Sequence, residues 1–509
     1  MFVLHQHQMG GIGMSSKLPS MMMNELLAPF TSANVALLMI HGVATDSRLV
    51  RPGYLFFALQ GVTQHGLDFV QDALTRGAIA IVVEQGTALE GMSVPVVEVE
   101  NLNQKLGHIA SRFFGEPSRQ LILIGITGTN GKTSCSHLMA QCLEESGQRC
   151  GILGTMGVGF VNQLGAVINT TPGAIELQNH LYQLLQQGAR CVAMEVSSHG
   201  LEQFRTAGCH FALAVFTNLS RDHLDYHGTM EAYGQAKLKL FAHDTLQAAI
   251  VNLDDAFSTQ VLATIPAGVE TIGVSLQVGE TTKTHKFICA TVTDRSLDGT
   301  QVSIESSWGP AQFTTHLLGE FNVSNLLLVL AGALSCGVTL SNAIASIRNL
   351  RAPDGRLESF HQPGWPLVVV DYAHTPDALQ KVLQTLHAHT TGSLWVLFGC
   401  GGDRDSGKRS LMGKVAEQWA QHVWLTNDNP RTEPSEKIIA DILSGIKQKQ
   451  AVTIEPDREV AIREMVSMAA ANDIILIAGK GHEDYQIIGH QKLSYSDRET
   501  VARILREVA

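Results

Sequence analysis

The segment TGTNGKT, residues 127–133, constrains the fold more than any other part of the chain. It follows the apolar run LILIGI at 121–126 and precedes SCSHLMAQCLEES at 134–146, which has a helical pattern. A glycine-rich turn between a buried strand and a helix directs backbone N–H groups and the positive end of the helix toward a phosphate. Lys132 is suited to neutralise a terminal phosphate, and Thr133 to ligate magnesium. Ile126 stands where the full P-loop pattern has glycine, so we predict a shortened P-loop in an α/β sheet.

The length of 509 residues exceeds what one hydrophobic core organises, so we expect two or three domains. Residues 1–22, which include His5 and His7, are expected to form a flexible leader. Residues 23–101 are expected to form a small N-terminal mixed α/β unit with one helical pattern, FVQDALTRGA. Its β-rich runs are VALLMIHGV, YLFFAL, AIAIVVE and VPVVEVE.

A central domain is expected over residues 102–352. Its nearly continuous apolar runs are typical of a mostly parallel sheet covered on both faces: LILIGI, CVAMEVSS, FALAVFTNL and AAIVNLD. The runs FICATVTD, TQVSIESS and AQFTTHLL alternate and are separated by turn residues, which predicts an antiparallel flank on this sheet. Two helices are expected to follow, beginning at Asn325 and Ser341.

Residues 353–509 are expected to form a C-terminal Rossmann-like, doubly wound domain after the boundary segment RAPDGR. The predicted strands are PLVVVDYA, SLWVLFGCGG, HVWLTND and IILIAGKG, with helices from Pro376, Lys408 and Pro434 between them. The sequence therefore predicts three α/β domains.

The net charge of −11 and pI near 6.0 argue against nucleic acid as a partner, because such binding relies on a broad basic surface. Eight cysteines without Cys-x-x-Cys spacing are expected to be reduced, as in a cytoplasmic protein. The N-terminus lacks the pattern of a secretory signal, and the longest apolar run is too short to cross a bilayer. We therefore expect a cytoplasmic protein without a membrane partner.

Phosphate binding alone is compatible with a kinase, an ATPase or a ligase. EVSSHGLEQFR at 195–205 begins with Glu195, and TNLSRDHLDYHG at 217–228 contains His223. Both follow predicted parallel strands, whose carboxyl ends are where open α/β sheets bind ligands. A carboxylate and an imidazole beside a triphosphate loop form a reasonable magnesium environment, although a structural role for His223 remains equally open.

Taken in order, the motifs of this chain resemble those of the Mur ligases of peptidoglycan synthesis. They are TGTNGKT, EVSSHGL, TNLSRDHLDYHG, LLGEFNVSN, DGRLE, DYAHTPDAL, GGDRD and DNPR, and the resemblance extends from about Thr45 to Glu483. The pattern is similar to the member that adds meso-2,6-diaminopimelate to UDP-N-acetylmuramoyl-L-alanyl-D-glutamate. That resemblance implies an ATP-dependent ligase in which the γ-phosphate activates a carboxylate as an acyl phosphate, which an amine then attacks.

The resemblance implies that Lys132, Glu195, His223 and Lys237 are catalytic. One Mg²⁺ is expected near Thr133 and Glu195, and a second near His223 and Lys237, with Lys237 carbamylated to N6-carboxylysine. Carbamylation converts an ammonium, which repels Mg²⁺, into an anion. Without the resemblance, Lys237 in EAYGQAKLKLF would be interpreted as a surface lysine, as Lys239 still is.

By the same resemblance, two further sets of residues bind substrates. The ATP set is Gly128, Thr129, Asn130, Gly131, Lys132, Thr133, Ser134, Asn322, Arg356, Asp371 and His374. The set for the UDP-linked substrate is Ser47, Thr170, Thr171, Ser197, Gln203 and Arg205. From the residues alone, an alternative role for Asn322 and Asp371 is to cap the helices that follow them. Thr170 and Thr171 could likewise belong to a turn or a helix cap. Asp46 and Arg48 would simply pair with each other.

Selectivity for the amino acid is expected to depend on Arg431 in TNDNPRTEP. Diaminopimelate differs from lysine by a second, distal carboxylate, and a guanidinium binds carboxylate through paired hydrogen bonds. The resemblance adds Arg404, Asp428, Asn429, Pro430, Gly479 and Glu483 to this site, with Glu483 receiving the distal ammonium. A solvated surface cluster is the alternative interpretation of DNPR.

Two alternative ligases share this scaffold, one adding lysine and one of the folate-polyglutamate type. Arg431 argues against the first, and Ser47 with the N-terminal unit argues against the second. A catalytically idle nucleotide-binding regulator would be expected to lack Lys132, Glu195 or Lys237, and all three are present. We expect a monomer that acts on the UDP-linked dipeptide, diaminopimelate and ATP.

Overall fold

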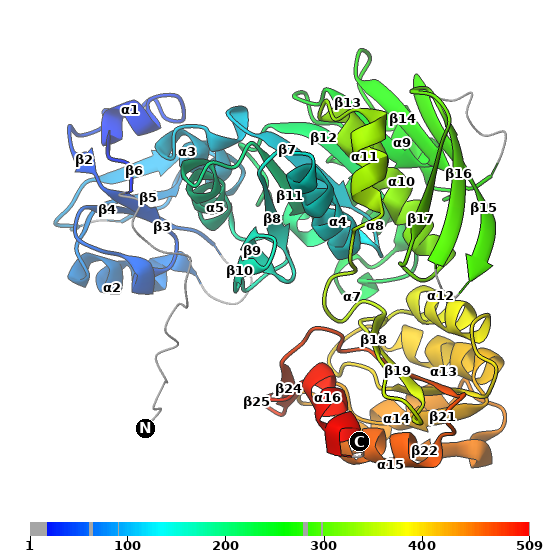
Figure 1. Ribbon diagram of the computed structural model, residues 1–509. Coiled ribbons are helices and arrows are strands. Elements are labelled where there is room, and N and C mark those ends of the chain that lie inside the picture. The colour runs from blue at the N-terminus through cyan, green and yellow to red at the C-terminus, as the bar shows by residue number, and fades with distance from the viewer. Residues whose placement is uncertain (1–17, 61–64, 90, 278–283, 297–298, 508–509) are drawn as a thin grey trace.

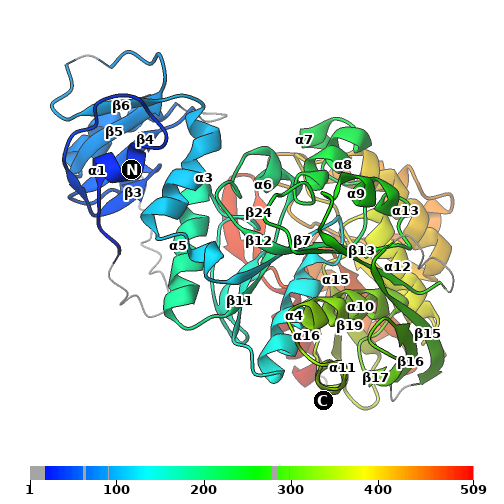
Figure 2. The same cartoon turned by 90° about the horizontal axis from the view of Figure 1, so that it is seen from above.

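The computed structural model describes residues 18–60, 65–89, 91–277, 284–296 and 299–507. Three sheets of four, eleven and six strands form the frame of the molecule (Figure 1). In Figure 1 the four-stranded sheet lies to the left of the eleven-stranded sheet, with helices between them, and the six-stranded sheet lies below it; Figure 2 shows the same helices from above. Most of the predicted leader, including His5 and His7, lies outside the described residues.

The N-terminal sheet is parallel throughout, in the order β3 (Gly42–Ala44), β4 (Tyr54–Ala58), β5 (Ala78–Glu84) and β6 (Val96–Val99). Helices α1 (Met23–Leu27) and α3 (Leu102–Phe113) share one core with it, while α2 (Val70–Thr75) covers the other face. The run VALLMIHGV does not form one strand. It changes pairing partner at His41, because β2 (Met39–Ile40) pairs with β1 (Met21–Met22) and β3 pairs with β4.

The central sheet has the order β10-β9-β8-β11-β7-β12-β13-β14-β15-β16-β17. The strands from β8 to β15 are parallel: β8 (Cys150–Gly154), β11 (Cys191–Glu195), β7 (Ile122–Thr127), β12 (Phe211–Phe216), β13 (Ala248–Asn252), β14 (Glu270–Ser275) and β15 (Lys286–Ser296). The predicted antiparallel flank is confirmed in β16 (Gly299–Ser306) and β17 (Ala311–Thr315). A second antiparallel flank, β9 (Gly157–Phe160) with β10 (Gln163–Gly165), was not predicted.

Both faces of the central sheet are covered, as its continuous apolar strands predict. On one face lie α4 (Lys132–Glu145), α10 (Glu320–Ser335) and α11 (Leu340–Ile347). On the other lie α5 (Ala174–Gln186), α6 (Ser198–Glu202), α8 (Met230–Leu238) and α9 (Ser258–Thr264). Helix α10 begins five residues before the predicted Asn325, directly after Gly319, whose φ of +93° ends the preceding extended segment.

The C-terminal sheet has the order β18-β19-β23-β20-β21-β22. Its strands are β18 (Glu358–Phe360), β19 (Leu367–Asp371), β23 (Ile474–Ala478), β20 (Leu394–Phe398), β21 (His422–Leu425) and β22 (Val452–Ile454), with β18 antiparallel. Helices α12 (Pro376–His387), α13 (Gly407–Trp419) and α14 (Ser435–Leu443) cover one face, and α15 (Arg458–Met468) and α16 (Asp497–Glu507) the other. This arrangement confirms the predicted doubly wound fold. The hairpin of β24 (Tyr485–Ile488) and β25 (Gln491–Ser494) was not predicted.

The strand register brings three predicted motifs to one edge of the central sheet. Glu195 at the end of β11 pairs with Ile126 of β7, and Phe216 at the end of β12 pairs with Thr127. The loops after these three strands therefore begin side by side at the carboxyl edge, where parallel α/β sheets bind ligands.

A buried ion pair joins the two helices on the outer face of the C-terminal sheet. Arg458 of α15 donates to Asp497 of α16 over 2.7 and 2.8 Å and to the carbonyl of Ala478 at the end of β23 over 2.8 Å. Asp497 is fully buried and also accepts a 3.0 Å hydrogen bond from the Tyr495 hydroxyl.

Asp497→Asn is expected to lower the free energy of unfolding by about 3–5 kcal/mol, since it leaves the Arg458 guanidinium buried without a matching charge. Glu507→Gln, at a pair with exposed Arg463, should cost less than about 1 kcal/mol. Urea unfolding of both variants measures the difference. Equal and small losses would mean that the buried pair contributes no more than a surface pair.

None of the eight cysteines, all of which lie among the described residues, forms a disulfide. Within the described ranges, none of the helices combines the length and apolar character needed to cross a bilayer.

Candidate active site

The P-loop lies between β7 and α4 and packs on the loop that follows β12. Thr217 donates from its hydroxyl to the Asn130 carbonyl at 2.6 Å, and the Asn218 side chain accepts from the Asn130 amide at 3.0 Å. A Cβ on Gly128 would lie 1.9 Å from the Thr217 hydroxyl, and Gly131 has a φ of +86°. Glycine is therefore required at both positions by close approach and by backbone conformation.

Lys132 begins α4 and turns its ammonium back over the loop, donating to the carbonyls of Gly128 and Thr129 at 2.8 Å each. Burial is the main cause that lowers the pKa of Lys132, while the carboxylates of Glu195 and Asp222 oppose the shift. The ammonium is thus held where it would meet phosphate oxygens.

Glu195 is fully buried at the end of β11 and accepts hydrogen bonds from residues of two other elements. The Thr133 hydroxyl donates to Oε2 at 3.0 Å, the Thr155 amide to Oε1 at 2.9 Å, and the Thr155 hydroxyl to Oε2 at 3.1 Å. Thr155 also contacts the hydroxyl of Thr170 at 3.0 Å. These contacts bring a carboxylate and hydroxyls together at the start of the P-loop helix.

Lys237 is 1% exposed, so the interpretation as a surface lysine is wrong. Its Nζ donates to the Gly128 carbonyl at 2.8 Å and lies 4.3 Å from the centre of the Tyr233 ring. Burial, followed by the positive charge of Lys132, lowers the pKa of Lys237 well below its usual value. Lys239 is a surface residue, as predicted, and pairs with Glu202 at 2.6 Å.

His223 lies at a left-handed backbone position, with a φ of +55°, directly after the buried Asp222. The Asp222 carboxylate is 3.4 Å from His223 Nε2 and 3.9 Å from His374 Nε2, so it faces histidines of both the central and the C-terminal units. Burial would raise the pKa of Asp222, but His223, His374 and Lys408 outweigh it and lower the pKa to about 2. Desolvation lowers the pKa of both histidines.

Several aromatic rings surround His223. Its ring centre is 4.9 Å from that of His199 and 5.9 Å from that of Tyr233, and His199 in turn is 4.2 Å from Tyr226. His227 donates to or accepts from the Ser198 hydroxyl at 2.9 Å. The loop segments EVSSHG and DHLDYHG are therefore joined through their rings.

Arg356, between the central and C-terminal units, reaches back to the P-loop. Its Nη2 donates to the Thr133 hydroxyl at 3.2 Å, and its guanidinium lies 4.5 Å over the Tyr372 ring. Asp371 accepts from the amides of Leu357 and Ala373 at 2.7 Å each, which holds the turn that carries Arg356. Asp371 does not cap α12, because that cap is Thr375. Asn322 is not a cap either, since α10 begins at Glu320.

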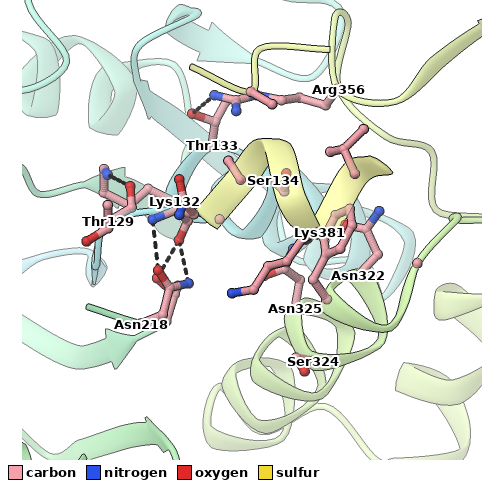
Figure 3. A pocket seen from close by; sticks show the side chains of 18 of the residues that line it. Thr129, Lys132, Thr133, Ser134, Asn218, Asn322, Ser324, Asn325, Arg356 and Lys381 are labelled. Carbon is pink, nitrogen blue, oxygen red and sulfur yellow. Dashed lines mark hydrogen bonds between the residues drawn. The ribbon is translucent and has the colours of Figure 1, made fainter. Parts of the chain in front are cut away.

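A cavity of about 960 Å³ opens between the central and C-terminal sheets beside the P-loop. Figure 3 shows Lys132, Thr133 and Arg356 around it, together with Asn322 and Lys381. The predicted site residues that line it are Thr129, Asn130, Gly131, Lys132, Thr133, Ser134, Thr170, Glu195, Ser197, His223, Lys237, Asn322, Arg356, Asp371 and His374. The structure thus brings together most of the predicted catalytic and ATP residues.

The remaining residues predicted for the UDP-linked substrate lie away from this cavity lining. Thr171 is buried, donates to the Glu195 carbonyl at 3.0 Å and accepts from the Ser197 amide at 3.0 Å. Arg205 donates to the Thr171 carbonyl at 2.8 Å and to Gln203. Ser47 is buried in the N-terminal unit, where its neighbours Asp46 and Arg48 pair at 2.6 Å as expected.

The residues predicted to hold the amino acid form a separate cluster at the carboxyl edge of the C-terminal sheet. Asp428 and Asn429 are 9% and 3% exposed, so DNPR is not a solvated surface cluster. Asn429 donates to Glu483 at 3.0 Å, and a Cβ on Gly479 would lie 2.6 Å from an Asp428 carboxylate oxygen. Arg404 and Pro430 lie in the two loops that meet here, with Arg404 exposed and Pro430 buried.

Arg431 is held by its backbone to the hairpin β24–β25. Its amide donates to the Ile487 carbonyl at 3.1 Å, and its carbonyl accepts from the Gly489 amide at 2.7 Å. Its φ is +54°. Among the described residues its side-chain hydrogen bonds use only Nη1, to the carbonyls of Gly402 at 2.9 Å and Asn429 at 3.4 Å. Nη2 and Nε therefore remain for a ligand.

Besides the pair of Asp222 and His374, three further polar contacts join described residues of the central and C-terminal units around the cavity. Asn130 donates to Asp377 of α12 at 3.0 Å, and Arg356 contacts Thr133 as described above. Arg221, next to Asp222, lies 3.4 Å from Asp405 in the GGDRD loop. The pair of Arg221 and Asp405 thus links the loop after β12, which packs on the P-loop, to the GGDRD loop of the amino-acid cluster.

Sequence reasoning missed several residues of these clusters. Asp222 and Asn325 lie within the motifs TNLSRDHLDYHG and LLGEFNVSN, in which the sequence assigns site roles only to His223 and Asn322. Asn325 lines the cavity, and its side chain contacts Cys135 at 3.4 Å. Lys480, fully buried in AGKGHE, was also missed. Asp222 and Lys480 are polar residues close to a predicted strand end, which is a signal that could have found them, whereas Asn325 lies within α10 and offers no such signal.

The donor atoms at the P-loop fit Mg²⁺ with nucleotide phosphates as additional ligands. Thr133 and Glu195 supply hard oxygen ligands 3.0 Å apart. Within the part of the chain that the structure describes, no group of three or more His, Cys, Asp or Glu side chains could hold a metal by itself. An unmodified Lys237 ammonium does not fit a cation site, whereas a carbamate there would.

Family models match three segments of the chain. They are the Mur ligase family catalytic domain over residues 39–114, the Mur ligase middle domain over 126–333, and the Mur ligase glutamate ligase domain over 355–481.

Curated relatives match across nearly the whole length. A UDP-N-acetylmuramoyl-L-alanyl-D-glutamate--2,6-diaminopimelate ligase from Coxiella burnetii is 44% identical, covering 95% of this chain and 99% of its own. The enzyme of the same name from Pseudomonas aeruginosa is 47% identical, covering 92% and 95%.

A solved structure with that enzyme name superposes with a TM-score of 0.69 at 37% identity, covering 96% of this chain and 99% of its own. MurF from Acinetobacter baumannii shares the fold, with a TM-score of 0.68 at 18% identity and coverage of 96% and 100%. With domain models along most of its length and relatives this similar, the chain belongs to the Mur ligase family.

Proposed function

We propose that this Mur ligase joins meso-2,6-diaminopimelate to UDP-N-acetylmuramoyl-L-alanyl-D-glutamate at the expense of ATP, in peptidoglycan precursor synthesis. The observation that carries the proposal is the 44–47% identity, over 92–95% of the chain, with relatives named for this reaction. The separation of a phosphate-loop cavity from a guanidinium-bearing cluster supports it, because the two substrates of an acyl transfer need distinct sites.

The site that handles ATP is assigned to the P-loop and the surfaces facing it. Backbone amides of residues 131–134, at the start of α4, would bind phosphate oxygens, while Lys132 and Arg356 neutralise their charge. Asn322, Asp371 and His374 complete the nucleotide site from the other side of the cavity. Asp371 contributes through the turn it holds, because both of its oxygens already accept backbone amides.

Mg²⁺ is the cofactor we assign, with Thr133 and Glu195 as ligands of one ion, and His223 and carbamylated Lys237 beside a second. When bound, these ions would neutralise charge on the phosphates and on the activated carboxylate. The lowered pKa of Lys237, caused by burial and by Lys132, supports carbamylation, because only the neutral amine attacks carbon dioxide.

The UDP-linked substrate is assigned to the side of the cavity that faces the N-terminal unit. Thr170 and Ser197 line the cavity, and Gln203 and Arg205 follow helix α6, whose N-cap is Ser197. Ser47 supplies a hydroxyl from the N-terminal unit. The terminal carboxylate of the substrate would then lie near Lys132 and Lys237, where transfer of the γ-phosphate forms an acyl phosphate and releases ADP.

The amino acid is assigned to the cluster of Arg404, Asp428, Asn429, Pro430, Arg431, Gly479 and Glu483. Arg431 would bind the distal carboxylate with Nη2 and Nε, the two donors that no described residue uses. The attacking amine displaces phosphate from the acyl phosphate, forming the amide. Exclusion of water protects the acyl phosphate during this step.

We further propose three functional domains: 23–101 for the UDP-linked substrate, 102–352 for ATP and 353–509 for the amino acid, with helix α3 at the start of the second packing on the core of the first. A monomer acting in the cytoplasm accounts for all the substrates, since the precursors are water-soluble. The acidic net charge of −11 argues against nucleic acid as a partner.

Phosphate release with purified protein, ATP and the UDP-linked dipeptide tests the proposed reaction. We expect rapid release with diaminopimelate and at least about a hundredfold lower kcat/KM with lysine, because lysine leaves the Arg431 guanidinium unpaired. Omitting the dipeptide is the control for idle ATP hydrolysis. Preference for lysine would identify the lysine-adding alternative, and turnover with a folate and glutamate would identify the polyglutamate type.

A further inference from the structure

Lys480 is a buried lysine of the amino-acid cluster to which no role has been assigned so far. It follows β23 in the segment AGKGHE, and its side chain is 0% exposed. Burying an ammonium costs free energy unless anionic or polar groups surround it. A lysine in such a position therefore needs partners, and the structure shows two.

The Lys480 ammonium joins Asn429 to Glu483. Nζ donates to Glu483 Oε2 at 2.9 Å and to Asn429 Oδ1 at 3.2 Å, and it lies 5.5 Å from the centre of the Tyr485 ring. Asn429 Oδ1 also accepts from the Ile487 amide at 2.9 Å. With its oxygen held by two donors, Asn429 turns Nδ2 toward Glu483, at 3.0 Å from Oε2.

Lys480 and Asn429 favour the ionised form of Glu483, which burial disfavours. Its side chain is 14% exposed, and burial raises its pKa, with Asp428 adding to the rise. Lys480 and Asn429 oppose the rise, while the Tyr485 hydroxyl lies 3.4 Å from Oε1. A carboxylate must be ionised and correctly oriented to bind an ammonium.

We propose that Lys480 is a positioning residue, whose buried ammonium orients Asn429 and Glu483 so that they bind the distal ammonium end of the diamino acid. The inference rests on the proposed function, because it assigns the cluster to diaminopimelate. It makes Lys480 a determinant of amino-acid affinity without any contact to ATP. Lys480 does not line the cavity beside the P-loop.

Lys480→Met tests the proposal, since methionine keeps much of the length of the side chain and removes its charge. We expect KM for diaminopimelate to rise about tenfold or more, with KM for ATP changed by less than about twofold. Lys492→Met is the matched control. Lys492 is exposed on β25, and its Nζ lies 4.1 Å from the centre of the same Tyr485 ring. Its substitution therefore removes a nearby charge that makes no contact with Asn429 or Glu483.

The double variant Lys480→Met/Glu483→Gln separates positioning from simple stability. Removing both charges leaves no unpaired buried ion, so the melting temperature should recover relative to Lys480→Met. KM for diaminopimelate should stay high, because the oriented carboxylate is lost. If Lys480→Met does not fold, Lys480→Gln, which keeps a hydrogen-bond donor but removes the charge, carries the test with the same expected rise in KM for diaminopimelate.

Two outcomes would overturn the inference: an unchanged KM for diaminopimelate in Lys480→Met, or recovery of KM together with stability in the double variant. Both presuppose that the unmodified protein turns over diaminopimelate. Absence of that turnover would instead contradict the proposed function, so the two failures are distinguishable.

Discussion

Lys237→Ala is expected to lower kcat for diaminopimelate-dependent phosphate release about a thousandfold, the larger of the two strongest effects we expect. Lys237 is 1% exposed and lies 2.8 Å from the Gly128 carbonyl, directly beside the P-loop. As a carbamate it would add an anion for Mg²⁺ near Asp222, in place of an ammonium that adds to the positive charge of Lys132. Loss of this group leaves the activated carboxylate without compensating charge.

Lys239→Ala is the matched control. It removes a lysine of the same segment that is exposed and pairs with Glu202, so kcat should stay within about twofold of the unmodified protein. A small carboxylic acid such as formate should restore part of the activity of Lys237→Ala by occupying the space left by the side chain. Labelled bicarbonate incorporated into the unmodified protein, and lost in the variant, would identify the carbamate directly. Full activity of the Lys237→Ala variant would contradict a catalytic role for Lys237.

The central and C-terminal sheets could be predicted because their strands are buried on both faces. Runs such as LILIGI and IILIAG are continuous and apolar, and each is followed by a helical pattern. The flank β9–β10 and the hairpin β24–β25 could not be predicted in this way. Gly157 and Gly159 interrupt β9, and β25 is exposed throughout, so neither segment has an alternating apolar pattern.

The P-loop cavity could be predicted from strand ends, whereas the charge pairing inside the site could not. The sequence places Glu195 and the loop after β12 at one edge of the sheet, and the register confirms that edge. Burial of Lys237 and Lys480 contradicts the general preference of lysine for solvent, and only tertiary contacts reveal it. The position of Asp222 between two histidines could not be predicted, because one of them is its neighbour His223 and the other, His374, lies more than a hundred residues away in the chain.

Arg431→Ala is expected to raise KM for diaminopimelate on the order of a hundredfold, with KM for ATP nearly unchanged. The backbone of Arg431 is hydrogen-bonded to the hairpin β24–β25 over 3.1 and 2.7 Å. The variant should therefore keep the conformation of the loop and lose only the interactions of the side chain. The two donors that no described residue uses, Nη2 and Nε, match the two oxygens of a distal carboxylate. Steady-state kinetics with each substrate varied in turn measures the effect.

Arg431→Lys separates charge from geometry at the same position. A lysine keeps one positive charge but cannot form the paired hydrogen bonds of a guanidinium, so most of the affinity for diaminopimelate should still be lost. Arg463→Ala, at an exposed pair on α15, controls for removal of a surface guanidinium. Because lysine as a substrate has no distal carboxylate, its poor kcat/KM should change little in Arg431→Ala, and the preference for diaminopimelate should shrink toward equality. Equal losses for diaminopimelate, lysine and ATP would place the effect in the folding of the loop and not in recognition of the second carboxylate.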